Sequence, residues 1–289
     1  MRQSSRLKER KLGIKPTKKT KKINFLKPIL ILSFVLIIFG ILFFVFSPKE
    51  WDGKSKFTVA SQTSSGDVTI QVLDPANSLV TNLQIPGSTL VDAANQLGTW
   101  KLGSITKLGS DKNLGSDFLK NTIIKSFNFP VIGSSNLSLL DKVRIKIFLL
   151  TTGSNNQINL DLKDTNYLIR SQLVDGSLGW KISQNMPTKV KAIFNDSSNE
   201  TIKTAVTILN STGTVSEGSM VGKVVEVMGL NVTSIQNLDK QNFDCKVVSM
   251  NADLAIKIAK IFNCEVNLKT PANNFDVEIN LGVKFAQRF

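Results

Sequence analysis

The residues of this chain that could do chemistry are few, and histidine is absent from all 289 residues. Without histidine there can be no Ser–His or Cys–His nucleophile pair and none of the usual zinc-ligand sets. The three arginines beyond residue 48, Arg144, Arg170 and Arg288, stand far apart in the sequence and form no cluster. Arg144 alternates with apolar residues, which is typical of the solvated face of a strand. We therefore expect no catalytic residue and no cofactor.

A second candidate is the turn Asn210-Ser211-Thr212-Gly213, which stands between an expected strand and an expected helix. Backbone amides at the start of a helix can bind an anion. The turn lacks the lysine of a phosphate-binding loop and the glycine spacing of a dinucleotide site. An ordinary turn between strand and helix is the favoured interpretation, and an anion or ligand site is the alternative.

Two cysteines, Cys245 and Cys264, are nineteen residues apart. If this part of the chain is exported, a disulfide between them could persist. Many exported bacterial domains hold no disulfide, so two buried free thiols are the favoured interpretation and a disulfide is the alternative.

Positive charge is concentrated at the start of the chain. Residues 1–27 hold eleven Lys or Arg against Glu9, whereas the formal charge of the whole chain is +14. The segment has no apolar period that would build a helix-turn-helix, so we expect no nucleic-acid binding. A basic cytoplasmic tail that sets topology and rests against anionic lipid fits it better.

An uncharged apolar stretch follows the tail directly. It runs from Ile29 to Ser47, and at 1.5 Å per residue it is about as long as the hydrocarbon core of a bilayer is thick. A cleaved signal peptide is the alternative, but no small-residue cleavage site follows. We predict a transmembrane helix at 28–47, with the N-terminus in the cytoplasm and the rest extracytoplasmic. Trp51 would be an interfacial anchor.

The remaining sequence predicts mixed α/β structure, in α+β two-layer domains behind that helix. Residues 48–66 are polar and predict a linker; 67–200 and 201–289 predict two α/β regions. The strands expected from alternation or apolar runs are 68–73, 79–85, 140–150, 166–173, 179–183, 204–209, 230–235, 244–249, 265–268 and 275–281. The helices expected from 3.6-residue periodicity are 118–127, a segment ending at Met228, and 252–262.

The last ninety residues resemble the C-terminal domain that follows LytR–CpsA–Psr catalytic domains. Matching features are VTILN at Val206–Asn210, Gly213, GLNV at Gly229–Val232, and the closing Leu281-Gly282. The resemblance implies an extracytoplasmic domain that binds or positions a partner and does not catalyse.

The segment GDVTIQVLDPANSLVTNLQIPGST is similar to the opening of the family's catalytic domain, which transfers a glycan phosphate from a polyprenyl pyrophosphate to the cell wall. Asp67 falls on the family's first Asp, a metal ligand, although an ordinary residue at a strand start is the favoured interpretation. Where the family has Arg-Asp after Ile-Pro, this chain has Gly87-Ser88. Pyrophosphate chemistry needs guanidinium groups and Mg²⁺ held by carboxylates, so the resemblance implies a degenerate region at 67–200.

We therefore expect a membrane-anchored, non-catalytic protein of the cell envelope. Its expected partners are the lipid bilayer and a cell-wall glycopolymer or an envelope protein. The alternative is an active glycopolymer phosphotransferase, which would require Mg²⁺.

Overall fold

The computed structural model describes residues 30, 32–40, 50–134, 137–196 and 204–289. The chain divides into two compact units, Met1–Ser47 and Pro48–Phe289. In the first unit the described residues, 30 and 32–40, are helical and their side chains are exposed. Within the described ranges there is no helix of the length and apolar character needed to cross a membrane. The predicted tail at 1–27 and half of the predicted span at 28–47 lie outside those ranges.

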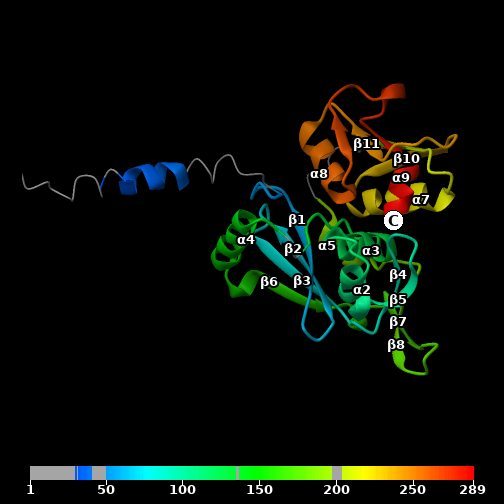
Figure 1. Cartoon of the computed structure of the whole chain (residues 1–289), viewed down its shortest axis with the longest axis horizontal. Helices are drawn as coiled ribbons and strands as arrows, with labels where there is room; N and C mark the ends of the chain where they lie inside the picture. Colours follow the sequence, from blue (N-terminus) through cyan, green and yellow to red (C-terminus); the bar gives the residue numbers. More distant parts are fainter. Residues whose placement is uncertain (1–29, 31, 41–49, 135–136, 197–203) are drawn as a thin grey trace, which may run out of the picture. The chain divides into compact units, whose positions relative to one another are not determined.

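The second unit is of the mixed α/β class and contains several sheets (Figure 1). Its first large sheet has the order β1-β2-β3-β6, in which β6 is parallel to β3 and the other neighbours are antiparallel. The strands are β1 (Phe57–Gln62), β2 (Val68–Asp74), β3 (Leu79–Ile85) and β6 (Gln157–Asp161). The hairpin predicted at 68–85 is confirmed, because β2 and β3 pair from Val68↔Ile85 to Asp74↔Leu79.

Shorter elements surround this sheet. There are two strand pairs, β4 (Leu90–Ala93) with β5 (Gly98–Lys101) and β7 (Leu168–Gln172) with β8 (Leu178–Ile182). There are also four helices, α2 (Ile105–Asp111), α3 (Asp117–Phe127), α4 (Leu139–Thr152) and α5 (Thr188–Phe194). The helix predicted at 118–127 is confirmed as α3, with Ile123 and Phe127 fully buried. The strands predicted at 166–173 and 179–183 are confirmed as β7 and β8.

The strand predicted at 140–150 is wrong, since this segment is the helix α4. The side chain of Ser138 caps the helix by accepting a hydrogen bond from the Asp141 amide at 3.1 Å. Asp141 and Ile145, one turn apart, face the interior. The alternation of Val143 and Ile147 with charged residues therefore does not mark a buried strand face, and both side chains are exposed.

The linker predicted at 48–66 also differs from the structure, since part of the segment belongs to the folded core. Trp51 is 2% exposed, and its ring stacks on Phe57 and meets Phe148 edge-on. Its indole N–H donates to the Ser55 carbonyl at 2.8 Å. Trp51 is therefore a core residue and not the interfacial anchor that we expected. Residues 57–62 form the edge strand β1.

The C-terminal part contains a five-stranded sheet of order β10-β9-β13-β11-β12. Its elements are β9 (Ala205–Asn210), α7 (Val215–Val227), β10 (Asn231–Asn237), β11 (Cys245–Val248), α8 (Ala252–Phe262), β12 (Glu265–Asn267), β13 (Val277–Leu281) and the terminal α9 (Val283–Arg288). All the strands and helices predicted after residue 203 are present, and Val277, Ile279 and Leu281 are fully buried as the alternation predicted.

Helices α7 and α8 pack on one face of this sheet. The strand register aligns Ile208, Ile279 and Val247 across the sheet. Gly222 of α7 lies close to Ile208, and Cys245, two residues before Val247, contacts the end of α8. The absence of side chains at Gly218 and Gly222 lets α7 approach Ile235 closely.

The two parts of the second unit are tied together through α3. Lys120 Nζ donates to the Lys260 carbonyl of α8 at 2.7 Å, and Lys125 Nζ donates to the terminal Phe289 carbonyl at 2.6 Å. The boundary predicted between residues 200 and 201 falls within 197–203, outside the described residues, and stays a prediction.

Candidate functional site

Asp67, the candidate metal ligand, ties two loops together. It follows the turn after β1, and its carboxylate accepts hydrogen bonds from the Gly87 amide at 2.8 Å and the Ser65 hydroxyl at 3.1 Å. Nowhere in the described ranges do three or more His, Cys, Asp or Glu side chains gather as a metal site would require. These contacts fit the structural role for Asp67 that the sequence favoured.

The backbones of three glycines, Gly66, Gly87 and Gly103, cross beside Asp67. We call this point the glycine crossing. The Gly103 amide donates to the Gly87 carbonyl at 2.8 Å. A Cβ atom on Gly87 would lie 2.6 Å from the Gly66 carbonyl oxygen, closer than real Cβ contacts come. The side-chain amide of Gln62 donates to the Gly66 carbonyl at 3.1 Å and to the Gly103 carbonyl at 2.9 Å.

The glycine crossing leaves no room for an arginine where the resembled enzymes have one. The obstacle is backbone of the turn after β1, which cannot move aside as a flexible side chain could. A guanidinium fork, which would orient a phosphate, therefore cannot be placed from position 87 without rebuilding the turn.

Of the four other cations that could replace this arginine, three pair with carboxylates and one, Arg170, is exposed. Arg144 is on α4 and pairs with Asp141 at 3.0 Å, so its predicted place on a strand face is wrong. Arg170 is exposed on β7, and Arg288 on α9 pairs with Asp244 at 2.7 Å. Lys101 Nζ lies 2.6 Å from the Asp175 carboxylate, and this hydrogen bond holds the pKa of Asp175 well below its usual range.

The turn Asn210-Ser211-Thr212-Gly213 uses its own polar groups internally. The Ser211 amide donates to the Leu281 carbonyl at 2.7 Å, and the Asn210 side chain donates to the Thr214 carbonyl at 2.8 Å. Thr212 Oγ1 donates to Asn210 Oδ1 at 2.6 Å. Asn210, Ser211 and Thr212 are all buried. This arrangement favours the ordinary turn over an anion site.

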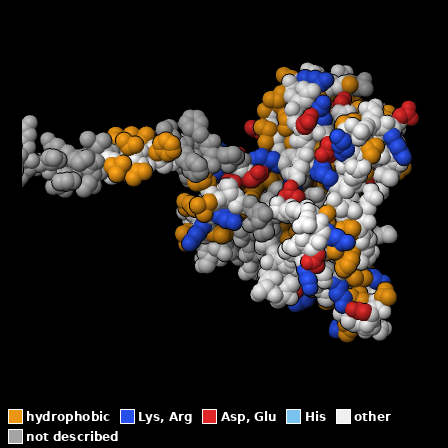
Figure 2. All heavy atoms as spheres, viewed as in Figure 1, with side chains coloured by type: hydrophobic (Ala, Val, Ile, Leu, Met, Phe, Trp, Pro, Cys, Tyr) orange, Lys and Arg blue, Asp and Glu red, His pale blue; other side chains and the backbone are white. Residues whose placement is uncertain are grey.

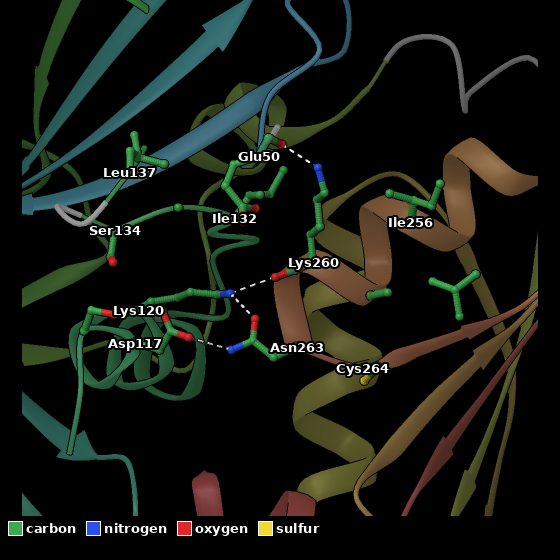
Figure 3. A pocket seen from close by; sticks show the side chains of 14 residues that line it. Glu50, Asp117, Lys120, Ile132, Ser134, Leu137, Ile256, Lys260, Asn263 and Cys264 are labelled. Carbon is green, nitrogen blue, oxygen red and sulfur yellow. Dashed lines mark hydrogen bonds between the residues drawn. The ribbon is translucent and has the colours of Figure 1, made fainter. Parts of the chain in front are cut away.

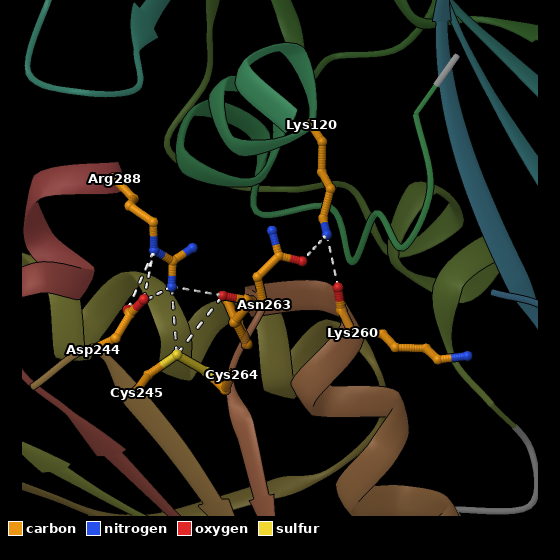
Figure 4. The surroundings of a disulfide bond; sticks show 8 residues. Lys120, Asp244, Cys245, Lys260, Asn263, Cys264 and Arg288 are labelled. Atoms are coloured by element: carbon orange, nitrogen blue, oxygen red, sulfur yellow. Dashed lines mark hydrogen bonds and ion pairs between the residues drawn. A yellow bond between two sulfur atoms is a disulfide. The ribbon is translucent and has the colours of Figure 1, made fainter. Parts of the chain in front are cut away.

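Cys245 and Cys264 form a disulfide, which differs from the pair of free thiols that we favoured (Figure 4). The parallel pairing of β11 with β12 brings the two residues together. The Arg288 guanidinium lies over the bond, with Nη2 donating to the Phe262 carbonyl at 3.0 Å and lying 3.5 Å from Cys245 Sγ. The disulfide joins the start of β11 to the residue directly before β12, and the contact with Arg288 connects α9 to it.

Reduction of this disulfide should lower the free energy of unfolding by about 3 kcal/mol, because the released loop regains entropy in the unfolded chain. Urea unfolding of the detergent-solubilised chain, with and without reductant, measures this change. The double variant Cys245→Ala, Cys264→Ala is the control and should not respond to reductant. Equal midpoints for the wild-type chain in both conditions would contradict the prediction.

A cleft lies between the two parts of the second unit, with a volume of about 460 Å³ (Figure 3). One wall is formed by α3 and the segment around Ile132–Ser134, and the other by α8. Four charged residues line it: Glu50, Asp117, Lys120 and Lys260. A second hollow of about 620 Å³ shares Glu50, Ile132, Ile256 and Lys260 with it. Both volumes are within the range of small-ligand sites.

Lys120 lies at the bottom of this cleft and is 2% exposed. Its ammonium donates to the Lys260 carbonyl at 2.7 Å and to Asn263 Oδ1 at 2.8 Å, and Asn263 donates in turn to Asp117 at 2.8 Å (Figure 3). Burial lowers the pKa of Lys120 from 10.5 to about 8, although the nearby carboxylates of Asp117 and Glu50 oppose the shift. Sequence reasoning missed this residue. The one available signal was a lysine between buried apolar residues of a predicted helix.

The pKa of Lys120 predicts a pH-dependent stability. Between pH 8 and 10.5 the unfolded chain would hold this proton and the folded chain would not, so stability should rise with pH by up to about 3 kcal/mol. Urea unfolding of the wild-type chain and of Lys120→Met across this pH range measures the contribution of Lys120 to the free energy of unfolding. The comparison isolates Lys120 because all other groups titrate in both proteins. Parallel pH profiles for the two proteins would contradict the prediction.

Comparison with known proteins gives one distant likeness. No family model matches the sequence, and no curated protein matches it. A crystal structure of B. subtilis TagT matches with a TM-score of 0.24 and 9% sequence identity, over 81% of this chain and 88% of that chain. A likeness this distant carries no argument about function. The resemblance to the LytR–CpsA–Psr family therefore still depends on the sequence motifs.

Proposed function

We propose that this protein is a membrane-anchored, non-catalytic binding protein of the cell envelope. The glycine crossing is the observation that supports the proposed absence of phosphotransferase activity. The backbone of Gly66 occupies the space that a side chain on Gly87 would need. At positions 87 and 88 a pyrophosphate substrate would meet neither the guanidinium fork nor a metal carboxylate, which this chemistry requires.

The proposed anchor is the apolar segment 28–47, which would span the bilayer once. The basic tail at 1–27 favours a cytoplasmic N-terminus because Lys and Arg are retained on that side. The unit Pro48–Phe289 would then be extracytoplasmic, where the disulfide between Cys245 and Cys264 is stable.

The proposed binding site is the cleft between α3 and α8, and its occupant would be a cell-wall glycopolymer or a segment of an envelope protein. Charges of both signs line the cleft, so it can receive hydrogen-bond donors and acceptors from one ligand. The buried ammonium of Lys120 holds the two walls together and gives the cleft a fixed shape.

A transfer assay tests the absence of catalysis. The purified full chain would be incubated with Mg²⁺ and a polyprenyl-pyrophosphate glycan, and released lipid phosphate would be measured by mass spectrometry. We expect no turnover above background, and the same background for Asp67→Ala. Mg²⁺-dependent turnover that disappears in Asp67→Ala would show that the protein is an active phosphotransferase.

A sedimentation assay tests the binding site. The detergent-solubilised chain would be mixed with purified cell-wall sacculi and with sacculi stripped of glycopolymer. The variant Lys260→Glu reverses a charge in the cleft, and Lys107→Glu on α2 is the matched surface control. Selective loss of binding in Lys260→Glu supports a polymer ligand in the cleft. Equal binding by both variants places polymer binding elsewhere, and no binding by the wild-type chain favours a protein partner.

A further inference from the structure

Helix α4 presents an apolar face outward. Its exposed large apolar side chains are Leu139 (77% exposed), Val143 (41%), Ile147 (54%) and Leu150 (75%). At 100° per residue these four lie within one quarter of the helix circumference. The exposed Lys142 and Lys146 lie directly beside them. Figure 2 shows hydrophobic side chains gathered over α4, with basic side chains next to them.

The other face of α4 is held firmly by the residues that follow the proposed membrane span. Asp141 is fully buried and accepts hydrogen bonds from the Glu50 amide at 3.1 Å and the Trp51 amide at 3.4 Å. Phe148 packs edge-on against the Trp51 ring at 5.5 Å. The start of α4 is therefore fixed to Glu50 and Trp51.

Chain length then limits how far α4 can be from the bilayer. The proposed span ends at Ser47, three residues before Glu50. Three extended residues cover at most about 11 Å. The interfacial layer outside the hydrocarbon core is itself about 5–8 Å thick on each side. The first turn of α4 must therefore lie at or next to the lipid headgroups, if the anchor is where the proposed function places it.

We propose that α4 is a membrane-docking helix, whose apolar face enters the headgroup boundary of the outer leaflet. An apolar stripe with adjacent lysines is typical of helices that lie in the plane of a membrane interface. Lys142 and Lys146 would pair with anionic lipid headgroups. Because α4 is fixed to the core through Asp141 and Phe148, docking would also set the orientation of the whole exported unit on the membrane.

Depth-dependent fluorescence quenching tests this proposal in the reconstituted full chain. An environment-sensitive nitrobenzoxadiazole probe would be attached at Ile147→Cys, at Val174→Cys and at Leu36→Cys, in vesicles with or without doxyl-labelled lipid. Val174 is fully exposed in the turn between β7 and β8, a strand pair that lies well away from α4 (Figure 1). Leu36 lies in the proposed span.

We expect blue-shifted emission and quenching by doxyl lipid at Ile147→Cys and Leu36→Cys, and neither at Val174→Cys. Quenching at Leu36→Cys alone would overturn the docking of α4 and leave the anchor intact. No quenching at Leu36→Cys would contradict the anchor itself. A blue shift at Ile147→Cys that doxyl lipid does not quench, and that grows with the protein-to-lipid ratio, would show that a second copy of the chain covers the helix.

The contribution of charge is tested with the same probe at Ile147→Cys. Lys142→Glu with Lys146→Glu should reduce quenching in vesicles that contain phosphatidylglycerol. The matched pair Lys107→Glu with Lys112→Glu changes two exposed lysines elsewhere and should leave it unchanged. Equal quenching for both pairs would overturn the role of the two α4 lysines.

Discussion

Gly87→Ala should lower the free energy of unfolding by about 3 kcal/mol, at the upper end for a small-to-large substitution. The new Cβ would lie 2.6 Å from the Gly66 carbonyl oxygen and 2.9 Å from its carbon. Both atoms are backbone, so relief requires the turn after β1 to move. That turn also holds the Gln62 and Asp67 hydrogen bonds that join the loops, and they would weaken together.

Urea unfolding of the detergent-solubilised chain measures this loss of stability. Two further variants serve as comparisons. Gly103→Ala should cost less, because its Cβ would lie 3.2 Å from the same oxygen. Ser64→Ala, in the same turn but exposed, should be nearly neutral. Equal stability of Gly87→Ala and Ser64→Ala would mean that the crossing is looser than described, and that an arginine could enter there.

The same site predicts the outcome of an attempt to restore the enzyme motif. Gly87→Arg with Ser88→Asp recreates the residues of the resembled family, but we expect an unstable chain without Mg²⁺-dependent transfer. The reason is steric, because the first atom of the new side chain already meets backbone. A stable double variant with transfer activity would show that residues 87 and 88 alone separate this protein from an active enzyme.

Trp51→Ala should lower the free energy of unfolding by about 3–5 kcal/mol, which is typical for truncation of a buried aromatic residue. The change removes the contacts with Phe57 and Phe148 and the hydrogen bond to Ser55. It also loosens the fixation of α4, because Phe148 belongs to that helix.

Two comparisons separate a core role from a membrane-interface role for Trp51. Trp51→Phe keeps most of the apolar contact and should cost about 1 kcal/mol, since mainly the indole hydrogen bond is lost. Trp100→Ala removes a tryptophan that is 41% exposed and should have a much smaller effect. If Trp51→Ala unfolds at the wild-type urea concentration but binds vesicles less deeply, the interfacial anchor predicted from the sequence would be right after all.

Part of the candidate site followed from residue types alone. The replacement of Arg-Asp by Gly87-Ser88 predicted a chain without the family's chemistry, and the absence of histidine excluded Ser–His and Cys–His pairs. The sequence could not show that the arginine is sterically excluded. That conclusion depends on Gly66 and Gly103, which meet Gly87 only because three loops converge. Lys120 was missed because its partners, Lys260 and Asn263, are more than a hundred residues away in the chain.

Local sequence determined the elements whose signals are complete within a few residues. The hairpin of β2 and β3, helices α3, α7 and α8 and the strand Val277–Leu281 all combine a clear period with turn or capping residues at their ends. Tertiary structure decided the segments whose period is ambiguous or whose partners are distant. Residues 140–150 satisfy strand alternation, yet the Ser138 cap and the contacts of Asp141 with Glu50 and Trp51 make them a helix. The disulfide likewise forms because β11 and β12 pair side by side, which the nineteen-residue spacing of its cysteines does not reveal.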